Sequence, residues 1–272
     1  MSSYSLAALT ALELSPPDLI DVASRAGYDA VGLRLIAATP GGVAYPLMDD
    51  PPLLRETRAR LQATGVKVGD LEILAIRPDT AVGAFEPLFE VGQRLGAKHL
   101  LVAGYDPDMS RFIDTYGALC DLAFNYGLTA DLEFMPWTNV PDLRSAIDVV
   151  RRAGRPNGGV LIDALHFDRS RSSVETIADV PQGSLHYWQF CDAPAERPTS
   201  TDDMLHTARA ERMFPGEGGI DLVPLVRAMP PDIVISLEVP TNELAKTTPA
   251  LVRAQRAIDG ARRVVDKAMQ SS

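Results

Sequence analysis

The sequence predicts an α/β fold in which eight parallel strands, each followed by a helix, close into a single (β/α)8 TIM barrel over residues 1–272. The length of 272 residues is close to the roughly 250 that one such barrel takes. Short apolar runs alternate eight times with longer segments of helical period, as in successive βα units. No Gly-x-Gly-x-x-Gly turn follows the first strand, which disfavours an open dinucleotide-binding sheet.

The expected strands are short apolar or β-branched runs bounded by turn residues. In chain order they cover residues 4–9, 30–35, 66–74, 99–103, 128–135, 159–165, 185–192 and 233–239. The expected helices cover residues 16–26, 51–63, 86–95, 109–125, 140–153, 172–177, 222–229 and 248–269. Ser15 before two prolines opens the first helix, and glycines such as Gly27 and Gly154 end several of them. Two longer loops, 36–50 and 193–221, follow strands, so we expect them to be lids or substrate walls.

Composition excludes several classes of function. The chain has 26 Lys and Arg against 36 Asp and Glu, a net charge of −10, without a basic run that would attract phosphate backbones. Cys120 and Cys191 are too distant in sequence to form a disulfide framework or a zinc knuckle. The beginning of the chain lacks the features of a signal peptide, and its apolar runs fall short of the roughly 18 residues of a membrane span. We expect a cytoplasmic protein with a small-molecule substrate, no nucleic-acid or membrane partner, and a homodimeric or homotetrameric state.

Polar residues stand at four successive strand ends, where a buried barrel strand should be apolar. They are Glu133, Asp163, Gln189 and Glu238. Strand ends of a barrel meet at one rim, so these groups are expected to converge, and like charges there require a counter-charge. An all-oxygen ligand set suits one divalent cation, Mn²⁺ or Mg²⁺. The alternative is that each acid forms an ion pair or caps a helix.

Five sequence motifs occur in the order of a known family. They are Leu-Glu-Phe at 132–134, Leu-Ile-Asp-Ala-Leu-His-Phe at 161–167, Gln-Phe-Cys-Asp-Ala-Pro at 189–194, Arg-Met-Phe-Pro-Gly-Glu-Gly at 212–218 and Ser-Leu-Glu-Val at 236–239. The chain resembles the xylose isomerase-like TIM barrel superfamily, which includes sugar isomerases and epimerases, inosose isomerases and dehydratases, and 3-dehydroshikimate dehydratases. The resemblance covers the whole chain in layout and is specific for the superfamily, but not for the reaction.

The resemblance implies site residues position by position. It implies a metal held by Glu133, Asp163, Gln189 and Glu238, with Glu133, Glu238 and His166 as catalytic residues. Gln189 stands where epimerases commonly carry histidine, and in this respect the chain resembles the dehydratase-like members. His186 is a rival ligand, but its place near the start of the strand favours a structural role.

Other residues are implied to approach the substrate. His166 matches the family's Asp-x-x-His element, and Arg209 and Arg212 match basic positions that touch substrate oxygens, although all three also fit purely structural or exposed roles. Further candidates for the pocket wall, with ion pairing or packing as their alternatives, are Glu72, Arg77 and Trp137. On the second strand, many relatives carry a carboxylate, whereas this chain has Gly32 and then Arg34.

The expected function is a metal-dependent isomerase or epimerase that acts on a keto-sugar or cyclitol-like hydroxyketone through an enediolate. A dehydratase shares the first step of this reaction and is the alternative, with a barrel that binds without turnover as a third possibility. The related AP endonucleases are excluded, because their trinuclear zinc sites need more than the four histidines of this chain. A phosphorylated substrate is disfavoured, since the last two strands are followed by no Gly-rich phosphate cradle.

Overall fold

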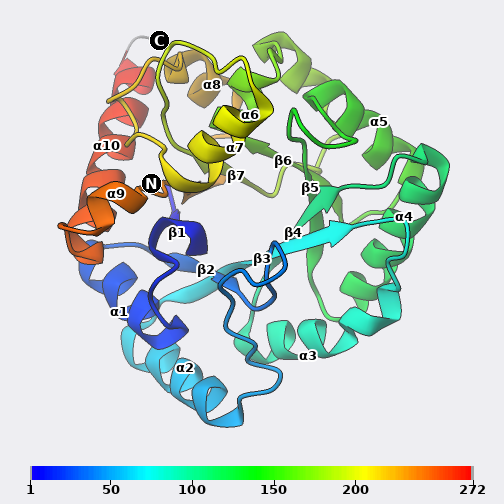
Figure 1. Ribbon diagram of the computed structural model, residues 1–272, viewed down its shortest axis with the longest axis horizontal. Coiled ribbons are helices and arrows are strands. Elements are labelled where there is room, and N and C mark those ends of the chain that lie inside the picture. Colours follow the sequence, from blue (N-terminus) through cyan, green and yellow to red (C-terminus); the bar gives the residue numbers. More distant parts are fainter. Residues whose placement is uncertain (1, 271–272) are drawn as a thin grey trace.

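Residues 2–270 are described by a computed structural model, and within them eight parallel strands form a closed barrel in sequence order (Figure 1). The strands are β1 (Tyr4–Leu6), β2 (Ala30–Arg34), β3 (Lys67–Ile76), β4 (His99–Gly104), β5 (Thr129–Glu133), β6 (Gly158–Asp163), β7 (Tyr187–Phe190) and β8 (Val234–Leu237). Ser5 of β1 pairs with Ala30 of β2 and with Ser236 of β8, which closes the ring. The predicted fold class is confirmed.

The helices lie around the outside of the barrel (Figure 1). They are α1 (Pro16–Ala26), α2 (Pro51–Thr64), α3 (Glu86–Leu95), α4 (Met109–Asn125), α5 (Leu143–Ala153), α6 (Ala164–Arg169), α7 (Thr201–Ala210), α8 (Leu222–Ala228), α9 (Asn242–Ala245) and α10 (Ala250–Gln270), with 3-10 turns at Ala8–Ala11, Val82–Phe85 and Val174–Asp179. The predicted caps form: the Ser15 hydroxyl accepts the Asp18 N–H, and Gly27 ends α1 in the left-handed conformation at φ 83°.

The structure corrects several local predictions. The first strand, expected at 4–9, ends at Leu6, and Ala8–Ala11 form a 3-10 turn. The sixth strand was expected to reach residue 165, but it ends at Asp163, whose carboxylate accepts the His166 N–H and caps α6. The helix expected at 172–177 is the 3-10 turn Val174–Asp179. The long loop after β7 contains α7, capped by Ser200, which the sequence pattern did not predict.

Apolar residues form two separate layers of core. The main cluster fills the space between strands and helices. A second, small cluster consists of Leu101, Leu161 and Tyr187, with Ile73 and Val234 against it. These residues lie on strands β3, β4, β6, β7 and β8, so they fill the interior of the barrel. Buried charged side chains of the strands, among them Asp70, Asp131 and Glu133, accompany this small cluster.

No helix within residues 2–270 has the length and the apolar character needed to cross a membrane.

The thiol of Cys120 on α4 is expected to be inert in the folded protein. It is fully buried, and burial raises its pKa from 9.0 to about 12, so the thiolate fraction at pH 8 falls about a thousandfold. Ellman's reagent should not react with Cys120 in the native state and should react with it fully in 6 M guanidinium. Rapid labelling of Cys120 under native conditions, located by peptide mapping, would contradict its placement.

Candidate functional site

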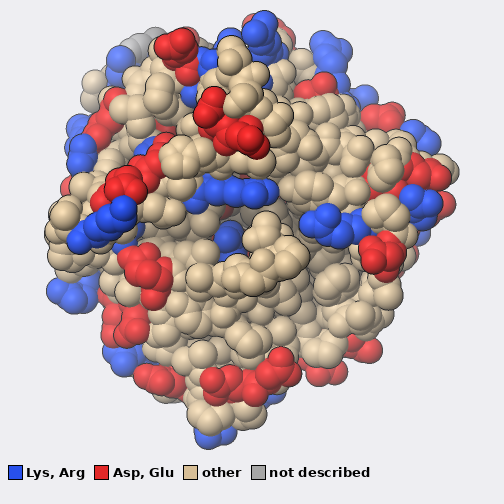
Figure 2. Space-filling view, in the orientation of Figure 1, with Lys and Arg blue, Asp and Glu red and all other residues tan. Residues whose placement is uncertain are grey.

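A cavity of about 190 Å³ opens at the carboxyl ends of the strands. Of the predicted site residues, those that line it are Glu133, Trp137, His166, Arg209, Arg212 and Glu238. Figure 2 shows the corresponding hollow on this face of the molecule, with Lys and Arg side chains at its rim. Both long loops supply walls: Thr39 and Val43 come from the loop after β2, and Arg209 comes from α7. The prediction that these loops form substrate walls is therefore consistent with the structure.

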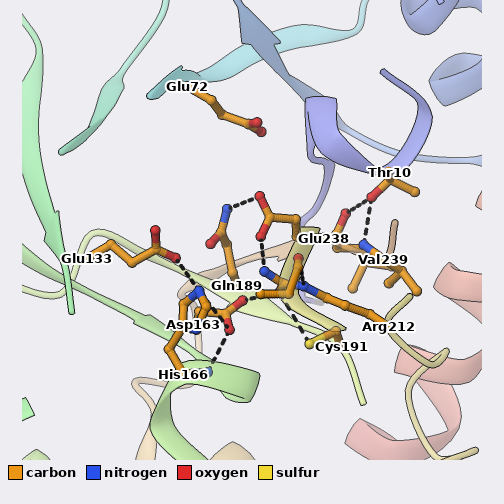
Figure 3. A network of polar contacts seen from close by, with 12 residues as sticks. Thr10, Glu72, Glu133, Asp163, His166, Gln189, Cys191, Arg212, Glu238 and Val239 are labelled. Atoms are coloured by element: carbon orange, nitrogen blue, oxygen red, sulfur yellow. Dashed lines mark hydrogen bonds and ion pairs between the residues drawn. The ribbon is translucent and has the colours of Figure 1, made fainter. Parts of the chain in front are cut away.

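Three carboxylates converge at the floor of this cavity. Glu133 ends β5, Asp163 ends β6 and Glu238 follows β8 directly. One carboxylate oxygen of each lies within 4.8 Å of the others, and Figure 3 shows Glu133 and Glu238 approaching from opposite sides. Barrel closure brings them together, although 105 residues separate the first from the last in the sequence.

Arg212 is the counter-charge to two of these carboxylates. Its guanidinium lies 2.6 Å from an oxygen of Asp163 and 2.6 Å from an oxygen of Glu238. It also donates to the Ala208 carbonyl and to the Cys191 sulfur, so four of its roughly five N–H donors have partners. These contacts give Arg212 the role of positioning the carboxylates, and its side chain also lines the cavity.

The site has room and charge for a cation. Three carboxylates face one guanidinium, which leaves a formal charge of −2 when all are ionised. The Gln189 amide donates to Glu238 over 3.1 Å, whereas the Gln189 carbonyl oxygen and Glu133 Oε1 are buried without hydrogen-bond partners. Unpartnered buried oxygens are costly unless a ligand satisfies them. Glu133, Asp163, Gln189 and Glu238 therefore fit a divalent cation, which is the predicted ligand set.

Burial and charge set the protonation of the carboxylates. Burial and repulsion from Glu238 raise the pKa of Glu133 well above its usual range, and burial raises the pKa of Glu238 to about 7 against the influence of Arg212. Burial alone would raise the pKa of Asp163, but Arg212 and His166 lower it below its ordinary value. Asp163 thus remains ionised, and a bound cation would favour the ionised forms of the other two.

His166 stands beside this group as a neutral imidazole. Its Nε2 lies 3.6 Å from Glu133 and 3.9 Å from Asp163. Burial lowers its pKa to about 4. The edge of Trp137 packs against the imidazole ring at 5.1 Å between centroids, and Nδ1 has no partner. The neutral ring is thus held in place with a nitrogen left for a hydrogen bond to a ligand.

The remaining predicted residues lie in different places. Glu72 is fully buried beneath the cavity, where it accepts the Ala8 N–H and pairs with Arg34 at 2.8 Å. Arg77 is exposed beside the cavity, with its guanidinium 4.9 Å from the centroid of the Tyr105 ring, and Tyr105 lines the wall. Of the three predicted arginines, only Arg209 is both exposed and on the cavity wall.

Arg34 lines the cavity, although the sequence analysis did not predict it as a site residue. Its side chain lines the cavity, is 9% exposed and has a buried Nε–H without a partner. The sequence contained a signal for Arg34, because a charged residue inside a buried strand is as unusual as a carboxylate at the end of one.

Asp192, just after β7, anchors the loop that carries Arg212. Its carboxylate accepts the backbone N–H groups of Ala193, Gly216, Gly218 and Ile220. A Cβ at Gly218 would collide with this carboxylate, so the close approach requires glycine. Backbone pairing between Asp192 and Met213 then fixes Arg212 next to the site.

Replacing Asp192 by alanine is expected to lower kcat/KM by about 10²-fold, because displacement of a positioning group by about 1 Å has this cost. The melting temperature should also fall, since four backbone N–H groups, one of them in a buried hydrogen bond, lose their acceptor. Thermal unfolding and steady-state kinetics measure the two effects. Asp221→Ala, at an exposed position of the same loop, is the matched control and should behave as the unaltered protein.

Fold and site together define a (β/α)8 barrel with a candidate cation site of strand-end carboxylates. The chain belongs to the xylose isomerase-like TIM barrel family, whose model matches residues 20–263.

Similar proteins include two enzymes and a zinc-containing structure. The 3-dehydroshikimate dehydratase of Pseudomonas aeruginosa is 32% identical over 143 residues, which are 50% of this chain and 22% of that protein. The inosose isomerase of Bacillus velezensis is 30% identical over 106 residues, 38% of this chain and 36% of that protein. The crystal structure of the IolI protein with a zinc atom superposes with a TM-score of 0.80 at 23% identity, covering 98% of this chain and 99% of the other. The matched segments therefore span well under half the length of these two curated relatives.

Proposed function

We propose that this protein is a divalent-metal-dependent isomerase or epimerase that acts on a keto-sugar or a cyclitol-like hydroxyketone. The observation that carries the proposal is the opposed placement of Glu133 and Glu238 around one cation site on the cavity floor (Figure 3). Two carboxylates on opposite sides of a bound carbon are the arrangement needed to remove a proton from one face and return it to the other.

The cation would be held by Glu133, Asp163, Gln189 and Glu238, and we propose Mn²⁺ or Mg²⁺ because all four ligand atoms are oxygens. When bound, it would act as a Lewis acid that stabilises the negative charge of an enediolate.

The chain's own residues would divide the remaining work. Glu133 and Glu238 exchange the proton with the carbon next to the carbonyl. Arg212 holds the carboxylates of Glu238 and Asp163 in fixed positions relative to each other. His166 hydrogen-bonds a substrate oxygen, and the apolar wall, which includes Leu12, Leu101 and Met135, excludes water from the reacting carbon.

A dehydratase of the 3-dehydroshikimate or inosose type is the second candidate. A specific observation favours it: Arg34, which is paired with Glu72 and has a buried Nε–H without a partner, lines the cavity, and Arg209 lies on the wall. Two cations near one small cavity suit a substrate with a carboxylate. The similarity to a 3-dehydroshikimate dehydratase agrees with this reading. In this case the enolate expels a β-hydroxyl group in place of being reprotonated.

The two candidates are separated by incubation in D₂O with Mn²⁺ and a panel of keto-sugars, inososes and 3-dehydroshikimate. Deuterium incorporation at carbon without loss of water supports the isomerase or epimerase. Formation of a conjugated, ultraviolet-absorbing product supports the dehydratase, and Arg34→Met should then raise KM more for the carboxylate substrate than for a neutral one.

The matched control is Glu133→Gln, which keeps the shape of the side chain and removes the base. Exchange at the unaltered rate from both epimers, or product formation at the unaltered rate, in this variant would contradict both candidates. If neither exchange nor product formation occurs with any member of the panel while Mn²⁺ is bound, the barrel binds without turnover and the proposal is wrong.

A further inference from the structure

A second cluster of ligand-type side chains lies at the opposite end of the barrel from the cavity. His99 begins β4, Asp131 lies in β5 and His186 immediately precedes β7. One potential ligand atom from each lies within 4.8 Å of the other two. His186 Nδ1 is 2.5 Å from Asp131 Oδ1, and His99 Nδ1 is 3.7 Å from Asp131 Oδ2. The Thr129 hydroxyl lies between two of them, 2.8 Å from His99 Nδ1 and donating to Asp131 Oδ2 over 2.5 Å. The cluster thus brings two imidazoles and a carboxylate together around this hydroxyl.

Strand register brings this cluster together and clears space for it. His99 is paired with Thr129 on β5 and with Asp70 on β3, and Asp131 is paired with Gly159 on β6. A Cβ on Gly159 would collide with both the Asp131 carboxylate and the His186 ring. The absence of a side chain at this position is therefore what allows the two groups to meet.

A buried polar group without a hydrogen-bond partner lies against this cluster. The ring of Tyr187 stacks on His99 at 4.9 Å between centroids, and its hydroxyl is buried without a partner. A buried polar group in this state is costly unless a ligand satisfies it. Asp70, paired with His99 on the neighbouring strand, lies outside the cluster: its carboxylate lies over Gly32 beside Glu72, and burial and repulsion from Glu72 raise its pKa well above the usual range.

We infer that His99, Asp131 and His186 form a second metal site, for a cation of the zinc type. Two imidazoles with a carboxylate are a ligand set of Zn²⁺, which prefers four ligands at about 2.0–2.2 Å and can take water as the fourth. This set differs from the all-oxygen set at the cavity floor, and Asp131 is separated from Glu133 by two residues, about 6.6 Å along an extended strand.

The site has a structural role because of its place in the barrel. The amino-terminal end of a (β/α)8 barrel contributes to stability, whereas chemistry occurs at the other end. A cation here would join β4, β5 and the segment before β7, and an ion that binds only the folded chain stabilises it. The inference does not depend on the proposed reaction.

The test measures Zn²⁺ binding in the full-length Glu133→Gln/Glu238→Gln variant, in which the cavity-floor site is disabled. After removal of metals by a chelator and dialysis against Zn²⁺, we expect one equivalent of zinc by mass spectrometry. X-ray absorption should show two imidazole nitrogens at about 2.0–2.1 Å. Zinc at 100 times its Kd should raise the melting temperature by about 5–11 °C.

Adding His99→Gln and His186→Gln to this variant should weaken zinc binding by at least about 100-fold. The control is His206→Gln, which alters an exposed histidine on α7 and should leave binding unchanged. If the multiple variant does not fold, the same absorption spectrum is recorded on the unaltered zinc-loaded chain, because the cavity offers only the imidazole of His166 among the described residues. Absence of zinc, or zinc without two imidazole ligands, would overturn the inference.

Discussion

Replacing Glu133 or Glu238 by glutamine is expected to lower kcat by about 10³–10⁴-fold. Each substitution removes a proton-transfer group, which is worth about 10²–10⁴-fold, together with a charged ligand of the cation. Side-chain volume and most packing are retained, so the fold should persist. Steady-state kinetics at saturating Mn²⁺ gives kcat, and isothermal titration gives the metal affinity, which should fall with it.

The effect on proton exchange distinguishes the two carboxylates. If they act on opposite faces of the substrate, each variant should lose net epimerisation, and one of them should retain deuterium exchange from a single epimer. Glu90→Gln, at an exposed position on α3, is the control and should have full activity. Unchanged metal content and activity in both site variants would contradict the assignment of the site.

Replacing Arg212 by methionine is expected to destabilise the metal-free protein by about 3–5 kcal/mol, because it leaves two buried carboxylates without their ion-pair partner. The melting temperature should fall by about 6–20 °C. Urea unfolding of the chelator-treated protein measures the loss. Addition of Mn²⁺ should recover part of it, since the cation supplies the missing charge.

Arg209→Met provides the comparison for this stability effect. Arg209 is exposed on the cavity wall, so its loss should change the free energy of unfolding by no more than about 0.5 kcal/mol. Equal stability of the Arg212→Met variant and the unaltered protein would show that the ion pairs contribute nothing to the fold.

The barrel and the cavity-floor residues were predictable because their signals are local. Hydrophobic periodicity, glycine caps and prolines mark the βα units. A carboxylate at the end of an otherwise apolar strand can be recognised in the sequence alone. Glu133, Asp163 and Glu238 were found in this way, and the structure brings them within 4.8 Å. α7 was not predicted, because its hydrophobic face is weak and Ala208 is the only residue of this helix that is buried.

Charged residues other than the cavity-floor carboxylates also occur in buried strands. Arg34, Asp70 and Asp131 are charged residues within buried strands, and by the same reasoning each needed an explanation. Asp131 meets two histidines from distant parts of the chain, and only the tertiary structure shows this. His186, expected to be structural, belongs to this group.

The sequence by itself determined the class of fold, the end of the barrel where the cavity lies, and the chemical type of the ligands there. These follow from residue type and spacing along one strand or helix. Tertiary structure alone decided which partner each buried charge has. Arg212 pairs with Asp163 and Glu238, and Glu72 pairs with Arg34. Asp192 accepts backbone N–H groups of a loop. The physical reason is that electrostatic energies depend on distance and burial in three dimensions, and neither quantity can be obtained from separation along the chain.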